Sequence, residues 1–423
     1  MIYGRGSLMA PTSGGSVATG DTTQSGAATG HHPKKLLSHN HLLKTGEGLE
    51  KAFELAQGMG IDYIRTDLEW RTLDTAQEGR WLWDVADSPT NHWTRSVGPA
   101  LECTRQRGMG TLVVVKVTDC PGYLHQAYMD SYRARWDGLE GTTPWWRLRP
   151  SLEDRRHAAL WAAWAEKRGA LGTDGPFNFL DELLRVLSAG VADGKYSIVG
   201  FNIENEPNVD NMPHQDNFKR LLLPTGTEGE GSRRRTAFTT YTTADLVKDV
   251  LHHVKEWCAN DPYLRDAITV VNLHSYDRHW DKRTWRDVGL GNPDLDVLGI
   301  DIYPTHFGTG TSRDKRNMRR LSAEYGKPWW VVEMEGAPSP PFWPWQRVHS
   351  GYPDVDTCRD WAQECAGMGA AVVGFYRLWG TYDGKMTSYD RAYNIYQDPG
   401  PNPRETVVKG KSYAAMIRDL FEG

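Results

Sequence analysis

The chain has 423 residues, of which 39% are hydrophobic and 24% charged, and its formal net charge is −5. An acidic balance argues against a nucleic-acid or anionic-membrane partner, which usually needs a basic face. No apolar stretch approaches the ~18 residues of a membrane span. The sequence is rich in aromatic residues, with 18 Trp and 18 Tyr, and flat amphipathic rings suit the faces of sugars as well as protein cores.

The first segment, residues 1–30, is rich in Gly, Ser, Thr and Ala and is predicted to be a flexible leader before one catalytic domain over 31–423. It lacks the charged n-region and apolar h-region of a signal peptide, so the localisation stays open. The cysteines show no CxxC or Cys/His ligand spacing, which favours free buried thiols over one incidental disulfide. They are Cys103, Cys120, Cys258, Cys358 and Cys365.

After the leader, short apolar runs alternate with helical patterns. Strands are expected at 35–41, 61–67, 111–116, 197–203, 267–272, 296–301, 329–332 and 371–376. Helices are expected at 48–59, 96–107, 154–168, 179–187, 243–258, around Arg283, and at 314–325, 355–368 and 410–421. Strands that are apolar at nearly every position and are followed by helices are typical of parallel strands buried on both faces.

Eight such units predict an α/β fold of the (β/α)8 TIM barrel type, in preference to an open doubly wound sheet. No G-x-G-x-x-G turn follows the first strand, so a dinucleotide-binding fold has no support. Long loops follow the third and fourth strands. Within the loop after the fourth strand, the polar stretch 222–240 is expected to be a mobile surface insertion. Its run of charges, Arg233–Arg235, is expected to be exposed to solvent.

Two carboxyl groups follow strands where such a barrel builds its active site, the C-terminal ends. Glu206 lies in Asn205-Glu206-Pro207 after the fourth strand, and Glu333 lies at the end of the seventh. Cleavage of a glycosidic bond needs one carboxylic acid to protonate the leaving oxygen and a second carboxylate at the anomeric carbon. The pair therefore points to glycoside hydrolysis. Because side chains alternate along a strand, Glu335 should point to the same side as Glu333. Glu335 is therefore a second candidate for the carboxylate at the anomeric carbon.

On these residues the chain resembles the clan A glycoside hydrolases, barrels with catalytic glutamates on strands four and seven. In that clan an Asn-Glu pair ends strand four, which implies that Glu206 is the acid/base and that Asn205 contacts the substrate 2-hydroxyl. The seventh strand of the clan often reads Lys-Pro-x-Trp-x-x-Glu-x-Gly, similar to residues 327–335 here. The resemblance implies Glu333 as the nucleophile, although Glu335 stands where glycine is more usual.

Three further segments resemble the clan. Arg65 in Ile64-Arg65-Thr66-Asp67 matches the strand-two arginine that holds the nucleophile ionised, since an adjacent arginine lowers the pKa of a carboxyl group. Tyr303 matches the strand-six tyrosine that hydrogen-bonds the nucleophile, and Trp379 the last-strand tryptophan that floors the −1 subsite. The resemblance extends from residue 35 to the C-terminus. Within the clan, the chain most resembles family 39 and its relatives.

Several of these residues also have purely structural interpretations. Arg65 could form a rim ion pair with Asp67 or Glu69, and Tyr303 could be a packed loop aromatic. Glu206 could be a carboxylate at a helix N-terminus. Glu204 is expected to be structural.

The loops supply further candidates, each with a packing alternative. His39 and His41 near the first strand, and His274 past the fifth, would bind sugar hydroxyls or be satisfied loop histidines. Loop tryptophans would form outer subsites or pack. They are Trp136, Trp145, Trp146, Trp343 and Trp345.

The sequence as a whole predicts a retaining glycoside hydrolase that cleaves a β-linked bond by double displacement, with its two carboxyl groups about 5–5.5 Å apart. The partner is a carbohydrate substrate, and no cofactor or metal is expected. A catalytically inactive carbohydrate-binding barrel is the alternative. A metal-dependent barrel lyase or isomerase would need three converging ligands, and Asp67 with Glu69 lacks that spacing. The sugar, endo or exo action, and the oligomeric state are left open.

Overall fold

The computed structural model describes residues 32–38, 49–77, 80–85, 91–117, 176–207, 221–228, 235–241, 243–273, 291–302, 312–334, 355–378, 394–396, 402–408 and 410–422. The chain divides into two units, Met1–His32 and Pro33–Gly423, and every element below belongs to the second. The predicted leader, residues 1–30, lies outside the described residues.

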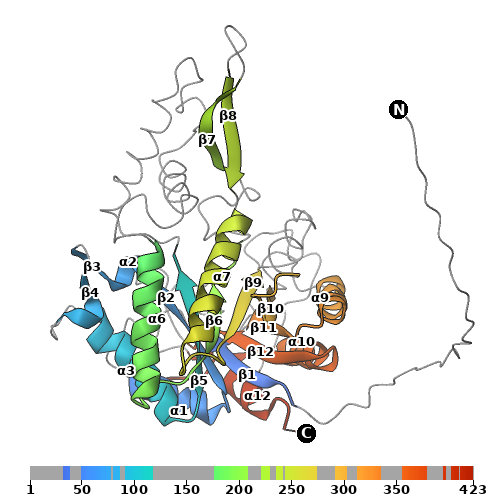
Figure 1. The fold of residues 1–423 in the computed structure, drawn as a ribbon. Helices are drawn as coiled ribbons and strands as arrows, with labels where there is room; N and C mark the ends of the chain where they lie inside the picture. The colour runs from blue at the N-terminus through green and yellow to red at the C-terminus, as the bar shows by residue number, and fades with distance from the viewer. Residues whose placement is uncertain are drawn as a thin grey trace, which may run out of the picture. The chain divides into compact units, whose positions relative to one another are not determined.

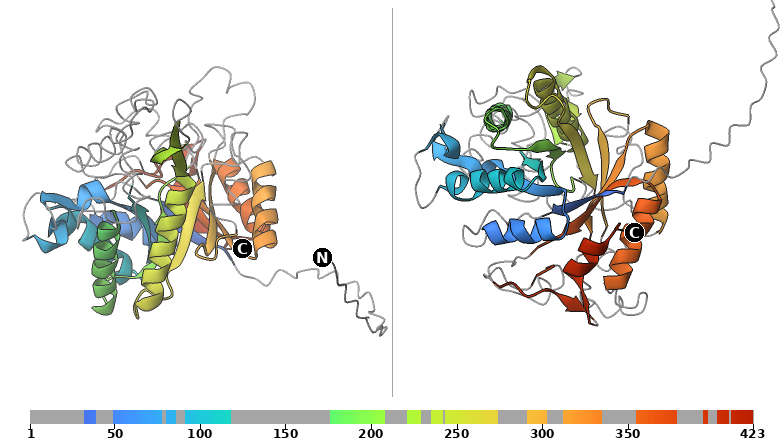
Figure 2. Two further views of the ribbon diagram at one scale, coloured as in Figure 1. Left: turned by 45° about the horizontal axis from the view of Figure 1, so that its top comes forward. Right: turned by 90° about the horizontal axis from the view of Figure 1, so that it is seen from below.

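Eight parallel strands close into a barrel with helices on its outside (Figures 1 and 2). Their order around the barrel is β1-β12-β11-β10-β9-β6-β5-β2. The strands are β1 Lys34–Ser38, β2 Tyr63–Glu69, β5 Gly110–Lys116, β6 Ile198–Ile203, β9 Ile268–Leu273, β10 Val297–Ile302, β11 Trp329–Met334 and β12 Ala370–Tyr376. Each overlaps its predicted range, and the predicted TIM barrel is confirmed.

The long helices follow the strands as predicted. They are α1 Leu49–Gly58, α3 Gly98–Gln106, α6 Pro176–Ala192, α7 Thr243–Asn260, α9 Ser312–Tyr325, α10 Val355–Gly367 and α12 Tyr413–Asp419. Helix α6 is longer than its predicted range because it continues through Gly190, where the ring of Tyr196 packs so closely that a Cβ would lie 1.9 Å from it. The predicted helices at 154–168 and around Arg283 lie outside the described residues.

Short elements complete the second unit. Between β2 and α3 lie α2 Trp70–Leu73, the strands β3 Asp74–Gln77 and β4 Arg80–Trp81, the 3-10 helix η2 Leu82–Asp84 and the π-helix η3 Trp93–Val97. A two-stranded antiparallel sheet, β13 Val407–Val408 with β14 Lys411–Ser412, precedes α12.

The stretch expected to be a mobile insertion, 222–240, contains an antiparallel hairpin instead. Strand β7, Leu221–Glu228, pairs with β8, Arg235–Tyr241. Leucines at the start of β7 stand in register with Thr239–Tyr241 near the end of β8. β-Branched and aromatic residues favour strands, and this signal was outweighed in the sequence by the glycines and charges between the two strands.

The barrel has two apolar regions. Its interior holds a cluster formed by Leu36, Leu112, Val270, Val297, Trp330, Val332 and Val372. A larger cluster packs the outer faces of the strands against the helices, and includes Ile64, Val113 and Phe201. Because successive side chains of a strand alternate between its two faces, Ser38 and Asn272, two positions beyond Leu36 and Val270, also face inward near the C-terminal ends of β1 and β9.

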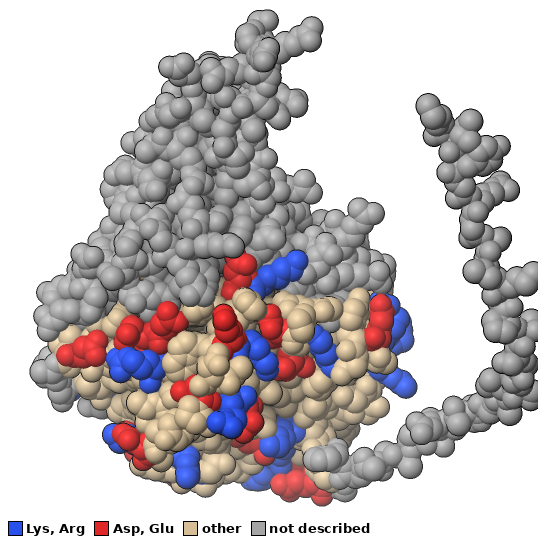
Figure 3. All heavy atoms as spheres, viewed as in Figure 1, with Lys and Arg blue, Asp and Glu red and all other residues tan. Residues whose placement is uncertain are grey.

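The outer surface and the thiols add two observations. On the face shown in Figure 3, acidic and basic side chains of the described residues are interspersed and neither sign gathers into a large patch. Within the described ranges, no helix has the length and apolar character that crossing a bilayer requires. Four cysteines, 103, 258, 358 and 365, are buried free thiols, as predicted, while Cys120 lies outside the described residues.

Candidate active site

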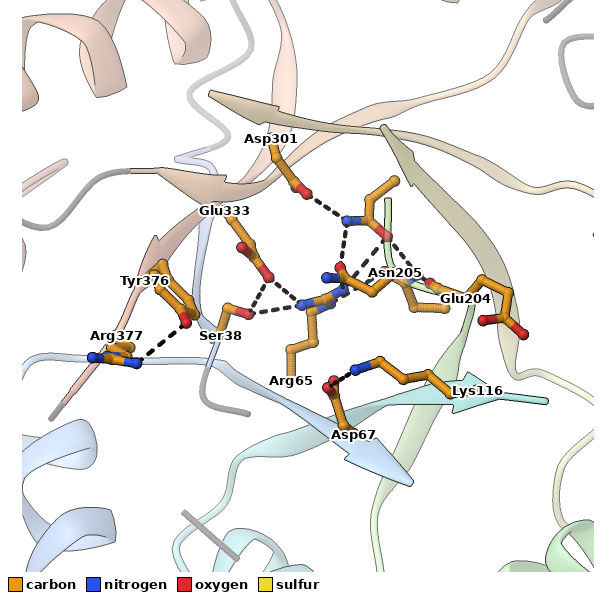
Figure 4. Close-up of polar contacts among 12 residues, drawn as sticks. Ser38, Arg65, Asp67, Lys116, Glu204, Asn205, Asp301, Glu333, Tyr376 and Arg377 are labelled. Carbon is orange, nitrogen blue, oxygen red and sulfur yellow. Dashed lines mark hydrogen bonds and ion pairs between the residues drawn. The ribbon is translucent and has the colours of Figure 1, made fainter. Parts of the chain in front are cut away.

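Four neighbouring barrel strands carry a polar residue at their penultimate position. These residues are Asn202 in β6, Asn272 in β9, Asp301 in β10 and Glu333 in β11, and all are buried. Asn272 is hydrogen-bonded to Asn202 and to Asp301, and Arg65 connects Glu333 to these residues (Figure 4). Of the four, only Glu333 was singled out from the sequence. The repeated position of one polar residue near the end of an otherwise apolar strand was the signal that could have found the others.

Arg65 from β2 lies at the centre of this layer and is fully buried. A guanidinium group has five N–H donors, and here five oxygens accept from it. They belong to Asn202 (3.2 Å from Nε), Ser38 (2.9 Å from Nη1), Glu333 (from Nη1), Asn205 (2.5 Å from Nη2) and Asn272 (3.4 Å from Nη2). We call these residues, with Asp301, the central network. Arg65 therefore joins strands from opposite parts of the sequence.

The alternative role for Arg65, a rim ion pair with Asp67 or Glu69, does not match this geometry. Both carboxylates face Lys116 at the end of β5 instead, with its Nζ 2.5 Å from Asp67 Oδ2 and 3.2 Å from Glu69 Oε1. We call Asp67, Glu69 and Lys116 the rim cluster. Burial lowers the pKa of Lys116, but the charges of Asp67 and Glu69 outweigh it and the pKa is raised.

Glu333 is positioned by an irregularity in the barrel. The register between β10 and β11 shifts after Ile300, so that Asp301 stands opposite Glu333. A bulge of this kind re-aims a side chain: Val332 packs in the interior cluster, and the next residue, Glu333, nevertheless contacts Arg65. Glu333 Oε1 accepts hydrogen bonds from the Ser38 hydroxyl at 2.9 Å and from Arg65. The carboxyl group is thus held by a cation and a neutral donor.

The turn after β6 carries the Asn-Glu-Pro motif in an unusual backbone conformation. Glu204 and Glu206 have φ values of 55° and 45°, a region that costs free energy for residues other than glycine and that clusters at functional sites. The Glu204 N–H donates to the Val115 carbonyl at 3.0 Å, and its Oε1 accepts from the Val117 N–H at 2.8 Å. Glu204 therefore fastens the turn to β5, while Glu206 is 8% exposed.

Asn205 is held by the central network. Its Oδ1 accepts from Arg65 Nη2 at 2.5 Å and from Asn272 Nδ2 at 3.0 Å. Two donors on one oxygen fix which way the amide group points. Among the described residues, no acceptor binds the Asn205 amide nitrogen.

Asp301 is the carboxyl group of the site that the sequence did not single out. Its Oδ2 accepts from Asn272 Nδ2 at 2.5 Å. Burial raises its pKa well above the ordinary value, and the negative charges of Glu333 and Glu206 raise it further, whereas Arg65 lowers it. A hydrogen bond with Glu206 also raises the pKa of Asp301, which places Glu206 next to the central network.

The remaining predicted site residues lie outside the described residues. They are His39, His41, His274, Tyr303 and Trp379, together with the competing Glu335 and the loop tryptophans. Strand β12 ends at Tyr376, three positions before Trp379. Over the ranges that the structure describes, no three His, Cys, Asp or Glu side chains are grouped as metal ligands would be.

Solved structures with the same architecture are known, although the sequence matches no protein-family model and no curated protein sequence. The endo-β-1,4-mannanase from Thermotoga petrophila is similar with a TM-score of 0.55 and 13% identity, over 93% of this chain and 77% of that one. The glycoside hydrolase family 5 mannosidase from Rhizomucor miehei has a TM-score of 0.51 and 12% identity, over 92% of both chains.

A β-galactosidase from Bacillus circulans sp. alkalophilus is similar with a TM-score of 0.53 and 15% identity, over 93% of this chain but 56% of that one. At such identities the likeness shows the fold. The chain therefore has the TIM-barrel fold of these glycoside hydrolases, and the relation to family 39 stays a prediction.

Proposed function

We propose that the protein is a retaining glycoside hydrolase that cleaves a β-linked, equatorial glycosidic bond, with Glu206 as acid/base and Glu333 as nucleophile. One observation carries the proposal. The guanidinium group of Arg65 binds Glu333 at the end of the seventh barrel strand and Asn205 after the fourth at the same time. Two carboxyl groups from these strand ends are what double displacement needs, and the fold shared with mannanases and galactosidases supports it.

The reaction would proceed in two steps. Glu333 attacks the anomeric carbon while the bond to the leaving oxygen breaks and Glu206 protonates that oxygen. The glycosyl ester on Glu333 is then attacked by water, whose proton passes to Glu206, and the Glu333 carboxylate is released. Arg65 and Ser38 both bind Oε1 of Glu333, and an adjacent guanidinium favours the charged form of a carboxyl group.

Asn205 would contribute to substrate binding. Because Arg65 and Asn272 hold its Oδ1, the amide nitrogen remains to donate to the substrate 2-hydroxyl. Hydrogen bonds to this hydroxyl strengthen in the transition state of such reactions. His39, His41, His274, Tyr303 and Trp379 would complete the subsites.

The proposal is tested with aryl β-mannosides, β-galactosides and β-glucosides together with β-1,4-mannan. Glu206→Gln and Glu333→Gln should each lower kcat by at least about 10³-fold, because each removes a group that acts on the reacting atoms. Glu182→Gln, an exposed helix glutamate paired with Arg185, is the matched control and should keep full activity. Activity that persists in both active-site variants would contradict the proposal.

The stereochemistry and the nucleophile are tested separately. NMR of the first product should show the β-anomer, since a retaining enzyme inverts twice. A 2-fluoroglycoside, which slows the second step, should leave its sugar on the peptide residue Glu333 and not on Glu335. A first-formed α-anomer would refute the retaining mechanism. A wild-type protein that binds these sugars without hydrolysing any would favour the inactive carbohydrate-binding barrel.

A further inference from the structure

Asp301 is a buried carboxyl group that double displacement does not use. It stands opposite Glu333 in the register of β10 and β11, and it is 0% exposed. Two residues earlier, Gly299 approaches β9 so closely that a Cβ there would lie 2.8 Å from the Val271 carbonyl oxygen. This close approach of β9 and β10 brings Asn272 within hydrogen-bond distance of Asp301.

The contacts of Asp301 are those of a neutral group. Among the described residues, its hydrogen-bond donor is the neutral amide of Asn272, 2.5 Å from Oδ2. Oδ1 is buried and receives no hydrogen bond from a donor in those residues. Asp67, by contrast, lies 2.5 Å from the ammonium group of Lys116. A carboxylate that is ionised and buried with one neutral donor and no cationic hydrogen-bond donor among the described residues would cost much free energy.

The charges around Asp301 point the same way. The charged or titratable groups that act on it from the described elements are Glu333 on β11, Glu206 after β6 and Arg65 on β2, while β9 presents the neutral Asn272. One guanidinium therefore faces three carboxyl groups. Arg65 is already paired with Glu333, so its charge is not available to balance an ionised Asp301 as well.

The contact between Asp301 and Glu206 needs a proton. The interaction with Glu206 raises the pKa of Asp301, and because an ionised carboxylate can only accept, a hydrogen bond between two carboxyl groups requires a proton on one of them. At least one of the two must therefore carry a proton. Burial, followed by the charges of Glu333 and Glu206, raises the pKa of Asp301 well above its ordinary value, which assigns a proton to Asp301.

We propose that Asp301 stays protonated throughout the catalytic cycle and donates a hydrogen bond to Glu206, as a positioning residue for the acid/base. The role of Glu206 rests on the proposed function above. Before reaction, Arg65 balances the Glu333 carboxylate, and Glu206 and Asp301 are both neutral. Once Glu206 has given its proton to the leaving oxygen, Glu333 is a neutral ester and Arg65 balances the Glu206 carboxylate. One cation thus balances one carboxylate at each stage, provided that Asp301 keeps its proton.

The hydrogen bond from Asp301 would also assist the reaction. Glu206 becomes negative as it transfers its proton, and a fixed neutral donor stabilises charge that develops in the transition state. A carboxylic acid kept neutral by an apolar site is a known way to supply such a donor. Asp301 itself forms and breaks no covalent bond in this scheme.

The first test needs no substrate and so does not depend on the proposed function. In infrared spectra of the whole protein with carbon-13-labelled aspartate, a neutral carboxylic acid band should be present at pH 7. It should disappear in Asp301→Asn and persist in Asp67→Asn, the matched control for an aspartate paired with lysine. A spectrum at pH 7 with no neutral-acid band that Asp301→Asn removes would overturn the proposal, whether or not the protein hydrolyses any glycoside.

The second test separates a neutral donor from a negative charge. Asn keeps a donor and carries no charge, so Asp301→Asn should keep kcat within about tenfold of wild type. Asp301→Leu keeps the bulk but lacks the donor, and should lower kcat by about 10²-fold with little change in KM, as loss of a transition-state hydrogen bond does. Equal losses in the two variants would show that the ionised carboxylate is required and would overturn the proposal.

Discussion

Two groups of charged side chains stand near the C-terminal ends of the barrel strands, and they balance their carboxylates in different ways. In the rim cluster, Lys116 faces Asp67 and Glu69, and these side chains are 15%, 5% and 24% exposed. In the central network, Arg65 and Glu333 are 0% and 4% exposed. Water can solvate the charges of the rim cluster. In the central network, each carboxylate must be paired with a protein cation or donor, or it must be protonated.

The two groups also differ in what their cations, Lys116 and Arg65, do. Lysine is a compact point charge, and Lys116 contacts only the two carboxylates of the rim cluster among the described residues. Arginine presents five donors in a fixed plane, and Arg65 uses them to hold five side chains from β1, β6 and the turn after it, β9 and β11 in one arrangement. We infer that the rim cluster mainly balances charge, whereas the central network fixes the positions of the side chains around Arg65.

The largest effect should come from removing the central cation. Arg65→Met leaves Glu333 without its cation and removes one donor from each of three amide oxygens, those of Asn202, Asn205 and Asn272. The free energy of unfolding should fall by about 3–5 kcal/mol, the cost of breaking a buried ion pair, with loss of hydrolysis. Urea denaturation at pH 7 measures the stability.

Arg185→Met is the control for this change. Arg185 is 54% exposed and pairs with Glu182 on the surface of α6, so its loss should cost at most about 1 kcal/mol. If the two variants lost similar unfolding free energy, the ion pair of the central network would contribute no more stability than a surface pair.

A second prediction concerns Asp301 and pH, and its effect should be smaller because a proton already relieves most of the cost of burial. A carboxyl group whose pKa is raised on folding stabilises the protein below its unfolded pKa, and this stability is lost as pH rises towards the folded pKa. Asp301→Asn cannot titrate. Its denaturation midpoint should equal that of wild type near pH 4 and exceed it increasingly as pH rises.

Asp67→Asn should behave in the opposite way. It removes a carboxylate that is 2.5 Å from Lys116, so it should be less stable than wild type at pH 7. If Asp301→Asn instead lost stability steadily as pH rose above 4, Asp301 would be an ionised partner like Asp67, and the contrast between the two clusters would disappear.

The fold was predictable because a closed parallel barrel buries both faces of each strand. Thr111–Lys116 was expected as a strand from its apolar run, and β5 covers Gly110–Lys116. Where elements depend on contacts rather than on local pattern, the expectation was wrong. Gly190 lies beyond the predicted helix 179–187 and is unfavourable within a helix, but α6 continues through it, and the missing side chain gives space to the Tyr196 ring. The hairpin of β7 and β8 was missed because the glycines and charges between its strands outweighed the strand-forming residues within them.

The site was predictable only in part. The motifs gave Glu206, Glu333, Asn205 and Arg65, because a resemblance to a clan supplies the residues that the clan shares. Asn272 and Asp301 belong to no such motif. Their proximity to Glu333 and Arg65 follows from the closure of the barrel and from the register shift between β10 and β11, and the pattern of any one strand encodes neither of these.

The smallest effect should come from the rim cluster and should depend on salt. Lys116→Met leaves Asp67 and Glu69, which both lie on β2, without the ammonium group from β5, but partial exposure lets water and ions screen the two carboxylates. The unfolding free energy should fall by about 1–2 kcal/mol at low salt and by less in 1 M NaCl, where the Debye length is about 3 Å. The Arg65→Met loss should be nearly independent of salt. If Lys116→Met instead lost about 3–5 kcal/mol of unfolding free energy independently of salt, Lys116 would behave as a buried ion-pair partner like Arg65. The contrast between the rim cluster and the central network would then be wrong.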